Sequence, residues 1–183
     1  MSLLHTIGHS TRAFPEFHNL LRAFEVNTLV DVRRFPGSRR YPQFNRENLS
    51  LALQQECIAY LHAPELGGRR VALADSPNTF WRNASFRAYA DYMATPEFRD
   101  ALERLLQLAG DGTVAVMCAE AVPWRCHRQL IADALVAHGH EVRHILSETR
   151  AEPHTLNNGA FVFADGSVQY PGKAGAQGSF FDG

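Results

Sequence analysis

The chain has 183 residues, of which 45% are hydrophobic and 20% are charged, and its formal net charge is -1. These values are typical of a single globular domain that buries a sizeable core. A charge near zero excludes a global electrostatic attraction to nucleic acid or to a membrane surface. The apolar runs are shorter than the roughly 20 residues that a membrane helix needs, so no membrane partner is expected.

Three cysteines are present, Cys57, Cys118 and Cys126. A small and odd number argues against a disulfide framework and favours a reducing compartment. The N-terminal residues carry neither the basic region nor the cleavage signature of an export signal. We therefore expect a cytoplasmic protein.

Hydrophobic periodicity predicts strands that alternate with helices along the chain. In order, the elements are a strand over 3–9, a helix from Pro15, a strand over 28–33, a helix over 45–56, a strand over 57–62, a long loop over 71–84, a helix capped by Ser85, a helix from Thr95-Pro96, a strand over 113–118, a helix closed by Gly139 and a strand over 141–146. This order predicts an α/β fold with a mostly parallel five-stranded sheet and helices on both faces.

The C-terminal part departs from this alternation. Asp165-Gly166 lies between two short β-prone runs, which is typical of a β-hairpin. Further on, the chain is rich in Gly, Ala and Ser. We therefore predict a single domain over 3–150, a hairpin extension over 151–171 and a flexible tail over 172–183.

Polar and reactive side chains end three of the predicted strands. His9 and Ser10 follow the first, Asp31 and Arg33 end the second, and Cys118 and Glu120 end the fourth. Open α/β sheets bind ligands beyond the carboxyl ends of their strands. The pattern therefore predicts that these side chains gather in one site.

Cys118 is the strongest candidate for a reactive group. It lies where a strand leads to the start of a helix, near backbone N–H groups and the positive end of the helix dipole. In such a place the pKa of a cysteine can fall from about 8.5 to between about 3.5 and 7.5. Arg125, Arg128 and a protonated His127 would lower it in the same way. The alternative is that Cys118 is a small buried residue of the core.

The loop over 33–46 holds five arginines and no acid, with Phe35, Tyr41 and Phe44 between them. Arginines beside aromatic rings are typical of contacts to phosphates and stacked bases. A solvated surface loop can have the same composition, so both interpretations stay open.

A metal site is the less favoured interpretation of the same residues. Cys118, Cys126, His127 and His9 are residue types that bind zinc. The chain has no Cys-x-x-Cys pair, and Cys126 and His127, as neighbours on a helix, would point apart. We therefore predict neither a metal nor another cofactor.

Four groups of residues form short motifs. They are Thr6-Ile-Gly-His-Ser10, Asp31-Val-Arg33 followed by Pro36 and Ser38, Leu66-Gly-Gly68, and Met117-Cys-Ala-Glu120 followed by Cys126-His-Arg128. Together they resemble the bacterial and archaeal family called domain of unknown function 488, over roughly residues 3 to 146. The cysteine-containing motif is specific, whereas the others are weak alone. The resemblance implies no particular reaction.

The order strand, cysteine, short arginine-containing loop and helix also resembles rhodanese-like sulfurtransferases and cysteine-dependent phosphatases. In both, backbone N–H groups surround a thiolate and hold an anion. Six residues separate Cys118 from Arg125, one more than in the phosphatase pattern. The loop has no glycine, and Pro123 lacks an N–H donor. The likeness therefore implies a layout and not a shared reaction.

Three functions are compatible with these observations. The first is a cysteine-dependent transferase or hydrolase with Cys118 as nucleophile or sulfur carrier. Its other catalytic residues would be Glu120, His127, Arg128 and Asp31. Its ligand would be a small anionic or phosphate-containing molecule, and the residues in contact with it would be His9, Ser10, Arg33, Ser38, Tyr41, Arg125 and Cys126. The second is a nucleic-acid-binding or processing module that uses the loop over 33–46. The third is a non-catalytic sensor of small anions at the same site.

Overall fold

The computed structural model describes residues 1–172, so the predicted tail, but for its first residue, lies outside the described residues. The strands are β1 (Leu3–Gly8), β2 (Thr28–Asp31), β3 (Ala59–His62), β4 (Val114–Cys118), β5 (Glu141–Ser147), β6 (Arg150–Pro153), β7 (Phe161–Val162) and β8 (Val168–Gln169). The helices are α1 (Phe14–Ala23), α2 (Arg46–Gln55), α3 (Ala84–Tyr92), α4 (Pro96–Asp111) and α5 (Arg128–Ala137), with short 3₁₀ turns η1 (Pro42–Phe44), η2 (Pro64–Leu66) and η3 (Pro123–Arg125).

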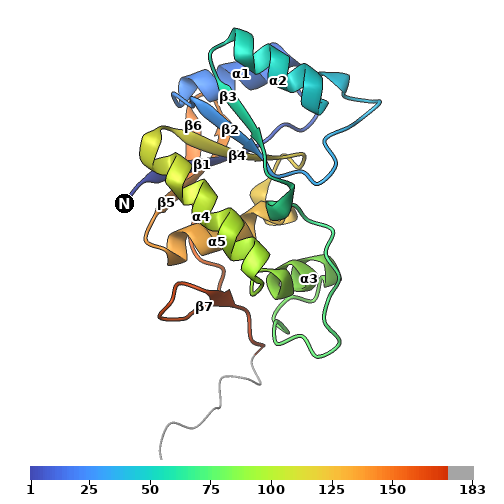
Figure 1. The fold of residues 1–183 in the computed structure, drawn as a ribbon, viewed down its shortest axis with the longest axis vertical. Coiled ribbons are helices and arrows are strands. Elements are labelled where there is room, and N and C mark those ends of the chain that lie inside the picture. Colours follow the sequence, from blue (N-terminus) through green and yellow to red (C-terminus); the bar gives the residue numbers. More distant parts are fainter. Residues whose placement is uncertain (173–183) are drawn as a thin grey trace, which may run out of the picture.

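Six strands form the main sheet in the order β3-β2-β4-β1-β5-β6 (Figure 1). The five strands from β3 to β5 in this order run parallel, because each is followed by a helical crossover before the next. In the C-terminal part, β7 and β8 form a separate antiparallel hairpin that contacts α5. The predicted α/β fold, with a mostly parallel sheet and a C-terminal hairpin, is confirmed.

The predicted count of five strands in the main sheet is too small by one. The additional strand, β6, pairs antiparallel with β5 at the edge of the sheet. Its sequence, Arg-Ala-Glu-Pro, contains no large apolar side chain. Short edge strands with charged residues and proline are common, because these residues discourage hydrogen bonding to a strand of another molecule.

Two helices start where capping side chains satisfy free N–H groups. Thr95 caps α4, as predicted, by accepting a hydrogen bond from the N–H of Phe98. The cap of α3 is Asn83 and not Ser85, because the Asn83 side chain accepts from the N–H groups of Ser85 and Phe86. Within residues 1–172, every helix is too short or too polar to cross a membrane.

Helices cover both faces of the sheet (Figure 1). Ala115 and Met117 of β4 pack into the core under α1 and α2, and Val116 and Cys118 belong to the core under α4 and α5. This is the alternation that a strand imposes. Asp31 of β2 is in register with Met117, so its side chain lies on the α1–α2 face, opposite to that of Cys118.

The C-terminal extension is fixed to α5 through Asp133, which is fully buried. Its carboxylate accepts hydrogen bonds from His154 Nε2 (2.8 Å), from the side chain of Asn157 (2.6 Å) and from the hydroxyl of Tyr170 (2.6 Å). The N–H of Tyr170 also donates to Asn78 in the long loop before α3. The extension therefore holds in place the helix whose first turn reaches the candidate site.

Candidate active site

The loop between β4 and α5, residues 119–127, packs directly against the end of β1. The N–H of His9 donates to the carbonyl of Cys118 at 3.0 Å, and the N–H of Ser10 donates to that of Ala119 at 2.9 Å. A Cβ at Gly8 would lie 1.8 Å from the carbonyl oxygen of Glu120. Only glycine allows this approach, so the residue before His9 determines where the loop runs.

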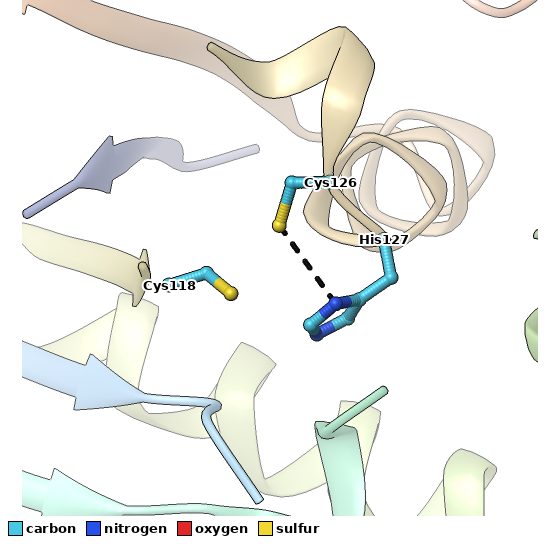
Figure 2. A group of neighbouring side chains, drawn as sticks. All are labelled: Cys118, Cys126 and His127. Carbon is cyan, nitrogen blue, oxygen red and sulfur yellow. Dashed lines mark hydrogen bonds between the residues drawn. The ribbon is translucent and has the colours of Figure 1, made fainter. Parts of the chain in front are cut away.

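Cys126 and His127 point into the same space as Cys118 (Figure 2). Their ligand atoms and the Cys118 sulfur all lie within 4.8 Å of one another, and Cys126 Sγ is 3.7 Å from His127 Nδ1. The expectation that Cys126 and His127 point apart on a helix is wrong. Cys126 precedes α5 in an extended conformation, with φ -133° and ψ 144°, so helical geometry does not apply to it.

The environment of Cys118 favours its thiolate. Its pKa is lowered to about 7, first by a hydrogen bond from the thiol of Cys126, and then by the backbone N–H groups of Ala119 and Glu120 and by the charge of Arg128, against the opposing effect of burial. The pKa of Cys126 is raised well above its usual value, because this residue is the donor. When the pair loses a proton, the negative charge therefore resides on Cys118.

His127 does not supply the positive charge that the sequence suggested. Burial, followed by the repulsion of Arg128, lowers its pKa to about 4, so the ring is neutral near pH 7. Its Nε2 atom is buried and has no hydrogen-bond partner among residues 1–172, and the ring packs at 4.8 Å from the ring of Tyr89. His127 thus forms an uncharged wall of the site.

Arg128 is the buried cation next to the thiolate. Its side chain is 1% exposed, and one of its nitrogens, Nη2, donates to the carbonyl of Ala121 at 2.9 Å. The other two, Nε and Nη1, have no hydrogen-bond partner within the described part of the chain. A buried cation is costly without a negative charge nearby. The thiolate of Cys118 provides that charge, which is why each group stabilises the other.

The two cysteines and His127 open into a cleft of about 440 Å³. Its wall also includes Glu120, which is exposed, and four arginines. They are Arg33, Arg34, Arg69 and Arg125. Of the residues predicted for the site, the cleft brings together Cys118, Glu120, Cys126, His127, Arg33 and Arg125. Arg128 lies behind this wall and not on it.

A second cavity of about 370 Å³ adjoins the cleft and shares Arg33, Phe35, Ala119 and Glu120 with it. The other predicted binding residues line this cavity. They are His9, Ser10, Ser38 and Tyr41. The predicted single site is therefore two adjoining spaces, with the thiol on one side of the shared wall and these polar groups on the other.

Asp31 is not in either space. It is fully buried, and its oxygens accept hydrogen bonds from the Arg33 guanidinium (2.9 and 2.6 Å) and from the Tyr60 hydroxyl (2.7 Å). Arg33 in turn contacts His9 Nε2 at 3.1 Å and the carbonyl of Phe44 at 2.7 Å. The predicted convergence of Asp31 with Cys118 is not found, because the two lie on opposite faces of the sheet. Asp31 instead orients Arg33.

His9 is held neutral and stacked. Burial, followed by the charge of Arg33, lowers its pKa to about 4. Its ring lies 4.3 Å from that of Phe44, and its Nδ1–H donates to the carbonyl of Ser10 at 2.8 Å. This tautomer leaves Nε2 free to accept from Arg33, so both ring nitrogens are engaged.

Two contributors were missed by sequence reasoning. Gly68, which the sequence offered only as part of the Leu66-Gly-Gly68 motif, lines the cleft, and a Cβ there would lie 3.0 Å from His127 Nδ1. Tyr60 donates to Asp31 from the neighbouring strand. The Leu-Gly-Gly motif could have indicated the role of Gly68. The role of Tyr60 depends on the pairing of β2 with β3, and no local sequence pattern encodes that pairing.

A soft divalent metal could use the donor set of Cys118, Cys126 and His127, since zinc takes two thiolates and an imidazole with a fourth position open. The charges around the three residues disfavour metal binding. Zinc with two thiolates is formally neutral and would leave the buried charge of Arg128 uncompensated. A single thiolate on Cys118 neutralises that charge, so the metal-free form fits the surroundings better.

One protein-family model, described as Domain of unknown function DUF488, matches residues 13–135. This range contains both cysteines of the site, His127 and Arg128. No curated protein and no solved structure matches the chain.

Proposed function

The chain belongs to the DUF488 family, and for this member we propose a cysteine-dependent enzyme that acts on a small anionic substrate. The observation that carries the proposal is the position of the Cys118 sulfur, which lines an open cleft within 4.8 Å of the ligand atoms of Cys126 and His127. The groups around it lower its pKa to about 7. At neutral pH about half of the molecules would hold the thiolate, which is the nucleophilic form. A cysteine that served only as core packing would have no such arrangement of donors around it.

In the first step, the sulfur lone pair of Cys118 would form a bond to an electrophilic centre of the substrate. The bond to the leaving group breaks, and the leaving group departs with its electron pair. Water or an acceptor then takes the group from sulfur and regenerates the thiolate. Glu120, the one carboxylate among the residues of the cleft wall, is suited to give a proton to the leaving group and to take one from the incoming acceptor.

The surrounding residues fit an anionic substrate. Arg125 and Arg33 line the same cleft as the thiol, and guanidinium groups pair well with phosphate or carboxylate oxygens. Arg128, being buried behind the wall, would stabilise the thiolate and not the substrate. The cytosol keeps neighbouring thiols such as Cys118 and Cys126 reduced, which is why we place the protein in the cytoplasm.

The test is the rate of alkylation by iodoacetamide at pH 7, read for each cysteine by peptide mass spectrometry. Cys118 is 8% exposed and Cys57 is exposed, so accessibility alone favours Cys57. We expect Cys118 to react faster in spite of this, and inorganic phosphate or sulfate to slow it by occupying the cleft. Slower reaction of Cys118 than of Cys57, unaffected by these anions, would refute the proposal.

A further inference from the structure

The cleft beside Cys118 carries an excess of positive charge that the chain as a whole lacks. Of its four arginines, Arg33 is paired with Asp31. The ion pairs formed within residues 1–172 do not involve the other three, Arg34, Arg69 and Arg125. The net charge of the chain is -1, so the excess is local. A concave wall concentrates such a field and favours ligands with multiple negative charges, such as phosphate esters.

An exposed aromatic ring stands at the boundary between the cleft and the second cavity. Phe35 lines both and is 65% exposed. The guanidinium carbons of Arg34 and Arg69 lie 5.7 and 5.6 Å from its ring centroid, and Arg34 Nη1 donates to the carbonyl of Arg69 at 2.9 Å. Aromatic rings and guanidinium planes are the surfaces on which nucleobases stack.

The backbone of this cluster is unusual at Arg69. This residue has a φ of +60°, a left-handed conformation that is uncommon for a residue with a side chain. It follows Gly68, which also lines the cleft.

The second cavity has a different chemistry. Ser10, Ser38 and Tyr41 line it with hydroxyl groups, together with the neutral ring of His9. Neutral donors and acceptors suit the hydroxyls of a sugar or the edge of a base. The cleft is rich in arginines, and the second cavity carries hydroxyl groups, with Arg33 and Glu120 on the wall that the two spaces share. Two such spaces with an exposed ring between them match a ligand with a charged end and a planar, neutral end.

We propose that the cleft and the second cavity together bind a nucleoside phosphate, with its phosphate at Arg69 and Arg125 beside Cys118 and its base stacked at Phe35. The inference rests on the proposed function for the identity of the site, and it names the substrate class. The nucleoside phosphate is either a free mononucleotide or one unit of a single-stranded nucleic acid.

The test is isothermal titration calorimetry at low salt on the Cys118→Ser protein, which keeps the cleft and removes the reactive sulfur. The probes are adenosine monophosphate, a short oligodeoxythymidine and inorganic phosphate. We expect at least one nucleotide probe to bind about fivefold or more tightly than phosphate, because stacking adds to the ionic contact. Adenosine monophosphate binding at least as tightly as the oligonucleotide would identify the free nucleotide as the ligand, and tighter binding of the oligonucleotide would identify a single strand.

Binding measurements on substituted proteins then distinguish the contribution of stacking from the contribution of charge. Phe35→Ala should weaken nucleotide binding about fivefold or more, Phe35→Tyr should retain it, and Arg69→Gln should weaken both nucleotide and phosphate. Phe161→Ala, which removes a ring that is 54% exposed on the hairpin, and Arg104→Gln on α4 are the matched controls and should bind as Cys118→Ser does.

Phosphate binding as tightly as every nucleotide, an unchanged affinity in Phe35→Ala, or no nucleotide binding would overturn the inference. Its failure is distinguishable from that of the proposed function. Nucleotide binding together with slow alkylation of wild-type Cys118 would refute catalysis and support this inference. Fast alkylation without nucleotide binding would support catalysis and refute this inference.

Discussion

Cys126→Ala is the substitution that most sharply separates an activated thiol from a merely buried one. The sulfur atoms of Cys118 and Cys126 lie within 4.8 Å, and the hydrogen bond from Cys126 is the largest cause of the lowered pKa of Cys118. A hydrogen bond to a charged group contributes about 1.5–3 kcal/mol, and a thiol donor belongs at the low end of that range. Losing about 1.4 kcal/mol reduces the thiolate-to-thiol ratio about tenfold.

With a pKa of about 7, Cys118 is about half thiolate at pH 7 in the wild type. A tenfold lower ratio leaves about one tenth as thiolate, so alkylation at pH 7 should slow about fivefold. The assay is the iodoacetamide rate of Cys118 between pH 5 and 9, followed by peptide mass spectrometry. Cys126→Ser is the control, because its hydroxyl still donates and the rate should fall less. Identical pH profiles for wild type and Cys126→Ala would refute the reasoning.

Three further changes test the supports of the site. Gly8→Ala places a Cβ 1.8 Å from a backbone oxygen of the loop after β4, so both the melting temperature and the alkylation rate of Cys118 should fall. The control is Gly110→Ala, whose Cβ would meet no atom of residues 1–172 within 4 Å. It should raise the free energy of unfolding by up to about 1 kcal/mol and leave the alkylation rate of Cys118 unchanged. Arg128→Met should slow alkylation at pH 7, because the Cys118 thiolate loses the positive charge that lowers its pKa; unchanged alkylation would show that this cation does not support the thiolate. Asp133→Ala should cost about 3 kcal/mol, or roughly 6–12 °C in melting temperature, and should expose the chain after residue 153 to proteases; a melting temperature equal to that of the wild type would contradict the anchoring role.

The alternation of strands and helices along the chain and the approximate place of the site were predictable, because both follow from local patterns. Alternating strands and helices require a parallel sheet, and its carboxyl ends gather the residues that follow each strand. That reasoning correctly brought Cys118, Cys126 and Glu120 into one cleft. It placed Asp31 there as well, because the sequence shows which residues of one strand share a face but not how two strands are registered.

The charges of the site were less predictable, because burial is a property of the fold. His127 looked like a cation beside Cys118, yet burial lowers its pKa to about 4. Cys126 looked like the first residue of a helix, and a boundary that lies two residues later, at Arg128, changes the direction of its side chain. A local pattern does not locate a helix start to better than a few residues.

The central claim is that the sulfur of Cys118 is ionised near neutral pH. The most direct measurement is a pH titration of the protein labelled with ¹³C at cysteine Cβ, followed by NMR, in which each of the three cysteines reports its own ionisation without any reagent. The account predicts that the Cys118 signal titrates with a midpoint near pH 7, and that the Cys126 signal remains that of a thiol throughout this range. A Cys118 signal that stays that of a thiol until about pH 8.5 or above would contradict it.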